Sequence, residues 1–84
     1  MSGDKLNIKL FAALKDAAGR AEVSLAWRPG MTSRDVLEEL RIHFLSMASL
    51  LPHSLVAVNG DHAEPARILM PEDEVAVLPP VSGG

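Results

Sequence analysis

One long amphipathic helix is predicted in the middle of the chain, and the rest of an 84-residue chain has to pack against it. Thr32 and Asp35 form a capping-box pattern, with Asp in the place of the usual Glu or Gln. Met31 and Val36 are placed for a hydrophobic staple across this N-terminus. Apolar residues then recur at helical spacing, and Pro52 ends the helix by residue 51 at the latest. The members of this apolar face are Val36, Leu40, Phe44, Met47 and Ala48.

Two strands and a short helix are predicted before this long helix. Apolar and polar residues alternate over residues 5–11 and again from Glu22 to Trp27, which is the pattern of half-buried strands. The Ala-rich stretch 12–18 between them predicts a short helix that ends at Gly19. Because the connection is short, the two strands are expected to pair antiparallel. Trp27 is interpreted as a core or rim residue.

The segment after the helix predicts a hairpin and one more strand. Residues 54–58 form an aliphatic run, and Asn59-Gly60 is the strongest short hairpin signal. A short strand over 62–64 should pair back across this turn. Residues 75–78 predict the last strand, which is cut off by Pro79-Pro80.

This order of elements predicts the fold class. Two antiparallel pairs that flank a single helix leave the first and last strands free to meet as parallel neighbours at the centre of the sheet. The expected architecture is therefore α+β, a β-grasp (ubiquitin-like) mixed sheet packed on one main helix, in a single domain spanning 1–84. Ile68 and Leu69, in the connection before the last strand, are predicted to be buried.

Composition excludes several classes of function. The net charge is −3, and no cluster of Lys and Arg stands out, so nucleic acid is not an expected partner. No leader pattern and no apolar stretch long enough for a bilayer is found, so the protein is expected in the cytoplasm, away from the membrane. The absence of cysteine removes disulfides, thiolate metal sites and thiol catalysis.

No side chain in the sequence stands out as catalytic or metal-binding. His43, His53 and His62 lack the spacing of zinc ligands, so no metal site and no bound cofactor are predicted. Ser82 has no local base that would make it a nucleophile. The acidic run 72–74 is interpreted as a solvated turn that can also steer a basic partner. The chain is therefore not expected to be an enzyme by itself.

The C-terminal tail, residues 79–84, is predicted to be flexible and to carry the function. A terminal glycine presents the least obstructed carboxylate a protein can make, and Gly83 and Gly84 have no Cβ to block a narrow channel. Pro79 and Pro80 favour an extended start. A carboxylate must be activated before acyl transfer, typically as an acyl-adenylate. Because no phosphate-binding loop is present in the sequence, the ATP and the sulfur donor are expected from partners.

The chain resembles the sulfur-carrying small subunits of molybdopterin synthase, in the ubiquitin-like family that also holds the thiamine-pathway carriers. The resemblance rests on Leu10-Phe11-Ala12, the short helix near Gly19, Val56-Ala57-Val58-Asn59, the stretch from Asp73 to Leu78, and the final Pro-Pro-Val-Ser-Gly-Gly. It implies that a ubiquitin-activating-like adenylyltransferase adenylates Gly84 with ATP. It further implies that a sulfur donor system converts the group to a thiocarboxylate for the molybdenum cofactor pathway.

The resemblance also implies how this tail meets its main partner. Pro79, Pro80, Val81 and Ser82 would form an arm that inserts into the large subunit of the synthase, with Gly83 giving clearance. There the sulfur passes to a pterin precursor. The family often has aromatic residues before the prolines, where this chain has Val77 and Leu78. We expect exposed aliphatic residues near Val58, Val77 and Leu78 to form a docking surface on the sheet face opposite the helix.

Two alternatives of different kinds remain at this point. A sulfur carrier of another pathway, for thiamine or amino-acid biosynthesis, would use the same terminus, although the thiamine carrier usually lacks the Pro-Pro. A ubiquitin-like binding module that never forms an acyl bond would require the terminal Gly-Gly to be accidental.

Overall fold

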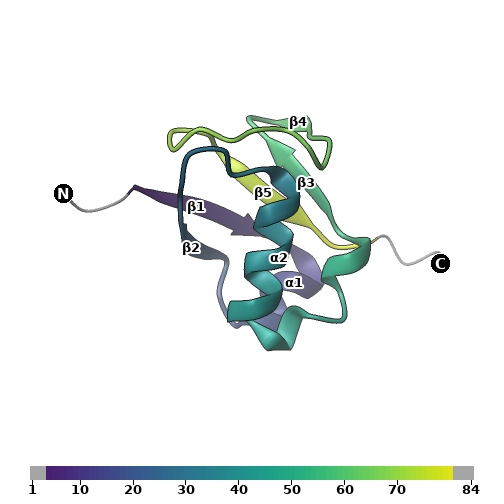
Figure 1. Ribbon diagram of the computed structural model, residues 1–84. Helices are drawn as coiled ribbons and strands as arrows, with labels where there is room; N and C mark the ends of the chain where they lie inside the picture. The colour runs from purple at the N-terminus through teal and green to yellow at the C-terminus, as the bar shows by residue number, and fades with distance from the viewer. Residues whose placement is uncertain (1–3, 81–84) are drawn as a thin grey trace.

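A five-stranded mixed sheet with a helix across one face forms the structure (Figure 1), a computed structural model that describes residues 4–80. The strand order is β2-β1-β5-β3-β4. Strands β1 and β5 are parallel neighbours at the centre, and all other pairs are antiparallel, so the predicted β-grasp arrangement is confirmed. In chain order the elements are β1 (Lys5–Leu10), α1 (Ala12–Ala18), β2 (Glu22–Ala26), α2 (Ser33–His43), the 3-10 turns η1 (Leu45–Met47) and η2 (Leu51–His53), β3 (Leu55–Val58), β4 (Asp61–His62) and β5 (Val75–Leu78).

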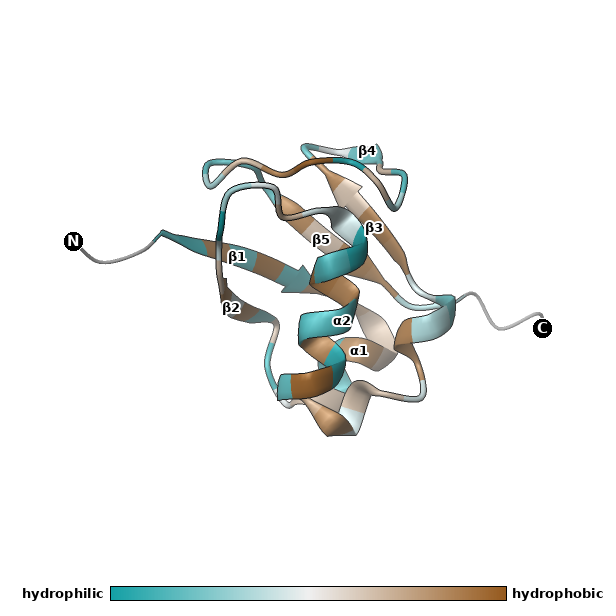
Figure 2. Ribbon diagram, in the orientation of Figure 1, coloured by the Kyte–Doolittle hydropathy of each residue, from teal (hydrophilic) through white to brown (hydrophobic). Residues whose placement is uncertain are grey.

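The core lies between the sheet and α2, and it is aliphatic. Apolar and polar residues alternate along β1, so one face of the strand is buried and the other is solvated (Figure 2). Each buried Leu, Ile or Val side chain contributes about 1.5–3 kcal/mol relative to the exposed state. The fully buried side chains that these elements contribute are Leu6, Ile8 and Leu10 from β1, Val36 and Leu40 from α2, and Val75 and Val77 from β5.

Helix α2 begins at the predicted capping box. The Asp35 amide donates to Thr32 Oγ1 over 3.3 Å, and the Thr32 amide donates to Asp35 Oδ2 over 2.9 Å. The hydrogen bond from the Thr32 backbone is the main cause that lowers the pKa of Asp35 below its ordinary value. Met31 and Val36 are both buried, as expected for a staple.

Helix α2 ends before the limit of residue 51 that the sequence set, and its predicted apolar face, which ran to Ala48, extends beyond it. The helix ends at His43, because Phe44 leaves helical geometry with φ −131° and ψ 77°. A helix that continued to residue 51 would be about 28 Å long, against about 20 Å for a six-residue strand. The chain turns back instead through η1 and η2, and this brings Met47 and Leu51 into the core.

Two further details differ from the prediction in the segment between β3 and β5. Asn59 and Gly60 both have positive φ, as the predicted hairpin turn requires, but β4 covers Asp61–His62 rather than 62–64. Leu69 is buried, whereas Ile68 is exposed. Because neighbouring residues of an extended chain point in opposite directions, only one of the two can face the core. Among residues 4–80, no helix is long and apolar enough to cross a lipid bilayer.

The ionised capping box should make stability depend on pH. The folded state lowers the pKa of Asp35, so its contribution is complete above the unfolded pKa of about 3.9 and is lost as the pH falls through the folded pKa. We therefore expect Asp35→Asn to be less stable than the parent at pH 7, by about 1 kcal/mol, with the gap closing toward pH 2. Urea unfolding across this pH range measures the gap. Asp16→Asn, at an exposed position of α1, is the control. A stability difference between Asp35→Asn and the parent that stays constant with pH would contradict the role of the ionised Asp35.

Candidate functional site

Strand β5 leads directly into the tail. It lies between β1 and β3, and the tail starts at one end of the sheet (Figure 1). Pro79 is half-buried and Pro80 is exposed immediately after it. The other tail residues with assigned roles, Val81, Ser82, Gly83 and Gly84, lie outside the described residues, so the carrier, clearance and insertion roles stay predictions. The structure thus defines where the tail begins, between two paired strands.

A set of hydrogen bonds around Asn59 positions the start of β5. The Asn59 side chain donates to Asp73 Oδ1 over 3.0 Å and accepts from the Glu74 amide over 2.9 Å, and the Asn59 amide donates to the Glu74 carbonyl over 2.8 Å. Asp73 Oδ2 also accepts from the Met70 amide, and this bond is the main cause that lowers the pKa of Asp73. Glu74 binds Lys9 Nζ at 2.9 Å and so raises the pKa of Lys9. We call this set the Asn59 clasp.

The docking prediction was wrong for Val58 and Val77. Their exposed fractions are 1% and 0%, and both belong to the core beneath α2. Both faces of these strands are apolar in sequence, but successive residues point to opposite faces. Val58 and Val77 take the inner face, and Leu78, with 40% exposed, is on the outer face as expected.

Leu78 has two exposed neighbours on the outer face of the sheet. Leu55, 51% exposed, is its partner in the β3–β5 ladder. Phe11, 45% exposed, follows Leu10, which pairs with Val77, and its backbone is still extended. It therefore lies beside Leu78 on the other flank. We call Phe11, Leu55 and Leu78 the outer-face patch, an exposed apolar row at the point where the tail begins.

Sequence reasoning missed Phe11, Leu55 and the side-chain role of Asn59. The signal for Phe11 is the period-two alternation of β1, which buries Leu10 and so turns the next residue outward. Leu55 has no such signal, because β3 is apolar throughout. Asn59 was interpreted only as a turn residue. Its contacts with Asp73 and Glu74 join segments that are 14 and 15 residues apart, and nothing local in the sequence indicates them.

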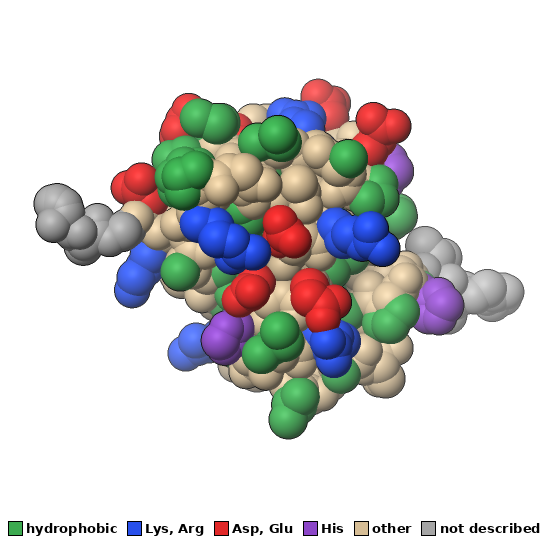
Figure 3. All heavy atoms as spheres, in the orientation of Figure 1, with side chains coloured by type: hydrophobic (Ala, Val, Ile, Leu, Met, Phe, Trp, Pro, Cys, Tyr) green, Lys and Arg blue, Asp and Glu red, His purple; other side chains and the backbone are tan. Residues whose placement is uncertain are grey.

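The helix side of the molecule has a different character. Figure 3, which looks onto α2, shows acidic and basic side chains interspersed over the helix. Arg41 pairs with Glu38 and lowers its pKa, and His43 lies 3.2 Å from Glu39. Exposed pairs of this kind contribute little to stability, so this is a solvated surface. Within residues 4–80, no group of three or more His, Asp or Glu side chains is arranged to hold a metal ion.

Comparison with known proteins finds matches that cover nearly the whole chain and that point to one family. The ThiS family profile matches residues 8–84. The chain is 30% identical over 84 residues to the molybdopterin synthase sulfur carrier subunit of Dictyostelium discoideum, covering 96% of this chain and 98% of that protein. It is 29% identical over 83 residues to the protein of the same name in Arabidopsis thaliana, covering 99% and 86%.

Solved structures show the same fold. SAMP1 from Haloferax volcanii has a TM-score of 0.82 and 32% identity, covering 95% of this chain and 99% of that chain. The small archaeal modifier protein 1 (SAMP1) of Methanosarcina acetivorans has a TM-score of 0.72 and 26% identity, with full coverage of both, 100% and 100%. A chain from the complex of subunits 1 and 2 of molybdopterin-converting factor of Helicobacter pylori 26695 shares the fold, with a TM-score of 0.63, 18% identity, and coverage of 95% and 99%.

The assignment of Val77 and Leu78 to opposite faces of β5 can be tested by comparing the stability of two variants. We expect Val77→Ser to lower the free energy of unfolding by on the order of 2–4 kcal/mol, because it removes buried apolar surface and buries a hydroxyl. Leu78→Ser should cost less than about 1 kcal/mol, because Leu78 already faces solvent. Urea unfolding of both variants gives the comparison. Equal losses at the two positions would contradict the assignment of faces.

Proposed function

The chain belongs to the ThiS family, and we propose that within this family it acts as the sulfur carrier subunit of a molybdopterin synthase, with Gly84 as the carrier residue. The observation that carries this proposal is the agreement of three curated relatives. Each is named molybdopterin synthase sulfur carrier subunit, each is 27–30% identical, and each match covers at least 95% of this chain. The Pro-Pro-Val-Ser-Gly-Gly ending supplies the chemistry that such a role requires.

The proposed cycle begins at the terminal carboxylate. A carboxylate oxygen of Gly84 attacks the α-phosphorus of ATP, which is held by a partner adenylyltransferase, and pyrophosphate leaves. Sulfide sulfur from a donor system then displaces AMP, which produces a thiocarboxylate at Gly84. Because both cosubstrates are bound by partners, this chain supplies only the acyl group and the surface that presents it. The reaction is proposed to take place in the cytoplasm.

Delivery requires docking on the large subunit of the synthase, and the outer-face patch is suited to this. Phe11, Leu55 and Leu78 lie at the end of the sheet from which the tail starts. A partner that covers them receives Pro79 and Pro80 at its edge and the two glycines deeper in its active site. The catalytic groups for sulfur transfer to the pterin precursor belong to that partner. In this proposal the subunit acts as a carrier, and its partner carries out the catalysis.

A second candidate function uses the same terminus. The similarity to the small archaeal modifier protein 1 structures, at 26% and 32% identity, favours it. An acyl-adenylate that meets a lysine amine instead of sulfide loses AMP and forms an amide. Gly84 would then attach this domain to another protein. Sulfur addition and protein attachment give different masses, so one experiment separates them.

Intact-mass spectrometry tests the carrier role. After incubation with its adenylyltransferase, ATP and sulfide, we expect the chain to gain about 16 Da, because sulfur replaces one oxygen. A chain that lacks Gly84, or one extended beyond it, should gain nothing while its unfolding curve is unchanged. A species with the combined mass of this chain and a second protein would favour the modifier function. A gain of the same size without Gly84 would exclude that residue as the carrier.

Docking can be tested apart from chemistry. We expect Leu78→Asp and Leu55→Asp each to weaken binding to the large synthase subunit by about tenfold or more, because a charge replaces an apolar contact. Isothermal titration calorimetry measures the affinity. The matched control is Leu45→Asp, since Leu45 is exposed but lies in η1, outside the outer-face patch. Patch variants that bind as well as this control would remove the patch as the docking surface.

A further inference from the structure

A groove runs between α2 and β3 beside the sheet. It consists of two adjoining cavities of about 370 Å³ and 280 Å³, which share Arg34 and Leu37 in their walls. We call it the α2–β3 groove, lined by Leu37, Leu51, Pro52, Val56, Ala63 and Pro65. Because its two cavities adjoin at Arg34 and Leu37, an extended chain could occupy both.

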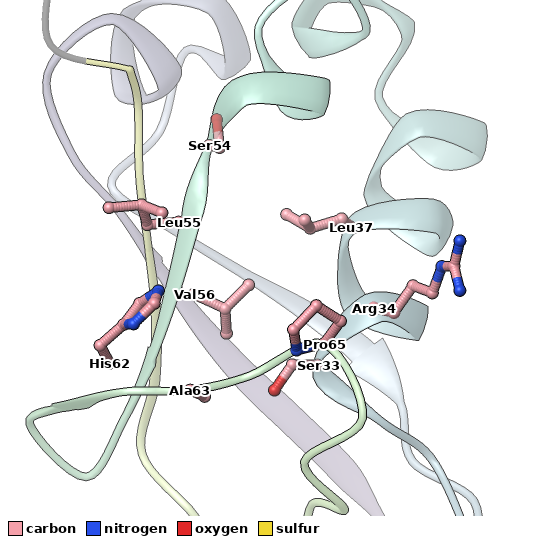
Figure 4. A pocket seen from close by; sticks show the side chains of 9 residues that line it. All are labelled: Ser33, Arg34, Leu37, Ser54, Leu55, Val56, His62, Ala63 and Pro65. Carbon is pink, nitrogen blue, oxygen red and sulfur yellow. The ribbon is translucent and has the colours of Figure 1, made fainter.

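The walls of the groove are mostly apolar, with Glu38 and Arg41 also lining the smaller cavity, and the groove reaches Leu55 at the edge of the outer-face patch. In Figure 4, Leu37 from α2 and Val56 from β3 point toward one another across it, while Leu55 and His62 point to the other side of β3. Strand β4 pairs only with Ala57 and Val58, so no strand within residues 4–80 covers this edge of β3 at Leu55. A partner that covers Leu55 is therefore already at the mouth of the groove.

Two polar groups of the groove have no partner in the described part of the chain. Ser33 Oγ is buried and makes no hydrogen bond, whereas Ser54 Oγ donates to the Leu50 carbonyl over 2.8 Å. Arg34 is exposed at the helix-side lip and forms no ion pair with residues 4–80, although its charge helps to lower the pKa of Asp35 and Glu38 on the same helix. A buried hydroxyl without a partner is costly unless a bound group satisfies it. A free guanidinium beside an apolar channel complements a carboxylate.

We propose that the α2–β3 groove receives an extended segment of the same partner that covers the outer-face patch. An apolar side chain of this segment fills the space between Leu37 and Val56, a backbone group meets Ser33 Oγ, and a carboxylate faces Arg34. The proposal rests on the proposed function, because it takes the large synthase subunit as that partner. It adds a second contact around the uncovered edge of β3, which would hold the sheet on its partner while the tail is inserted.

Three variants test the groove through binding of the large synthase subunit. Leu37→Asp should weaken binding about tenfold or more, because it places a charge in the apolar channel. Ser33→Ala should weaken binding severalfold without lowering the stability of the free chain, since Ser33 Oγ makes no hydrogen bond to lose. Arg34→Gln should slow association and flatten its dependence on salt. Surface plasmon resonance at several salt concentrations, with urea unfolding of each variant, measures these effects.

Matched controls make the outcomes distinguishable. Arg20→Gln removes the same charge outside the groove, and Leu45→Asp adds the same charge at an exposed site outside it. If the three groove variants bind like these controls while Leu78→Asp loses binding, the groove proposal is overturned and the docking patch stands. If the groove variants lose binding and Leu78→Asp does not, the groove stands and the patch falls. If the unaltered chain does not bind the large subunit, the proposed function fails. The proposal that a segment of this subunit occupies the groove then fails as well.

Discussion

The insertion of β5 between β1 and β3 is the interaction on which the rest of the structure depends. The last strand of the chain has only four residues, yet it is hydrogen-bonded on both sides and buries Val75 and Val77 completely. Without it, the N-terminal pair and the β3–β4 hairpin would share no sheet. The Asn59 clasp fixes its start, and the antiparallel pairing of Leu78 with Leu55 of β3 fixes its end. The tail is therefore held at its base by the centre of the fold.

Sequence patterns with a local cause predicted the fold well. The capping box set the start of α2, Gly19 set the end of α1 in the left-handed conformation, and Asn59-Gly60 set the hairpin. The end of α2 was not predictable in this way. The apolar spacing continues through Met47 because the 3-10 turns also bury that residue, so a periodic pattern persisted where the helix had ended.

The candidate site also has one part that the sequence predicts and one part that depends on packing. The role assigned to Gly84 came from its position and from the absence of cysteine, which need no structure. For the residues of the proposed docking surface, the prediction required knowing which residues of each strand face the helix. Leu55 to Val58 and Val75 to Leu78 are apolar throughout, so alternation cannot say which residues face the helix. Only the packing of α2 decides it, and Val58 and Val77 were assigned to the wrong face for this reason.

The register of the sheet also resolves the missing aromatic residue before the prolines. Leu78 stands at that position, and Phe11 is the next residue after Leu10, which is the last residue of β1 paired with β5, opposite Val77. An aromatic side chain is thus available to the proposed docking surface from the end of the neighbouring strand. The length of the tail also limits the geometry of the partner, because the six residues from Pro79 to Gly84 span at most about 20 Å. If the proposed function holds, the active site that receives Gly84 lies within this distance of the partner surface proposed to cover Phe11, Leu55 and Leu78.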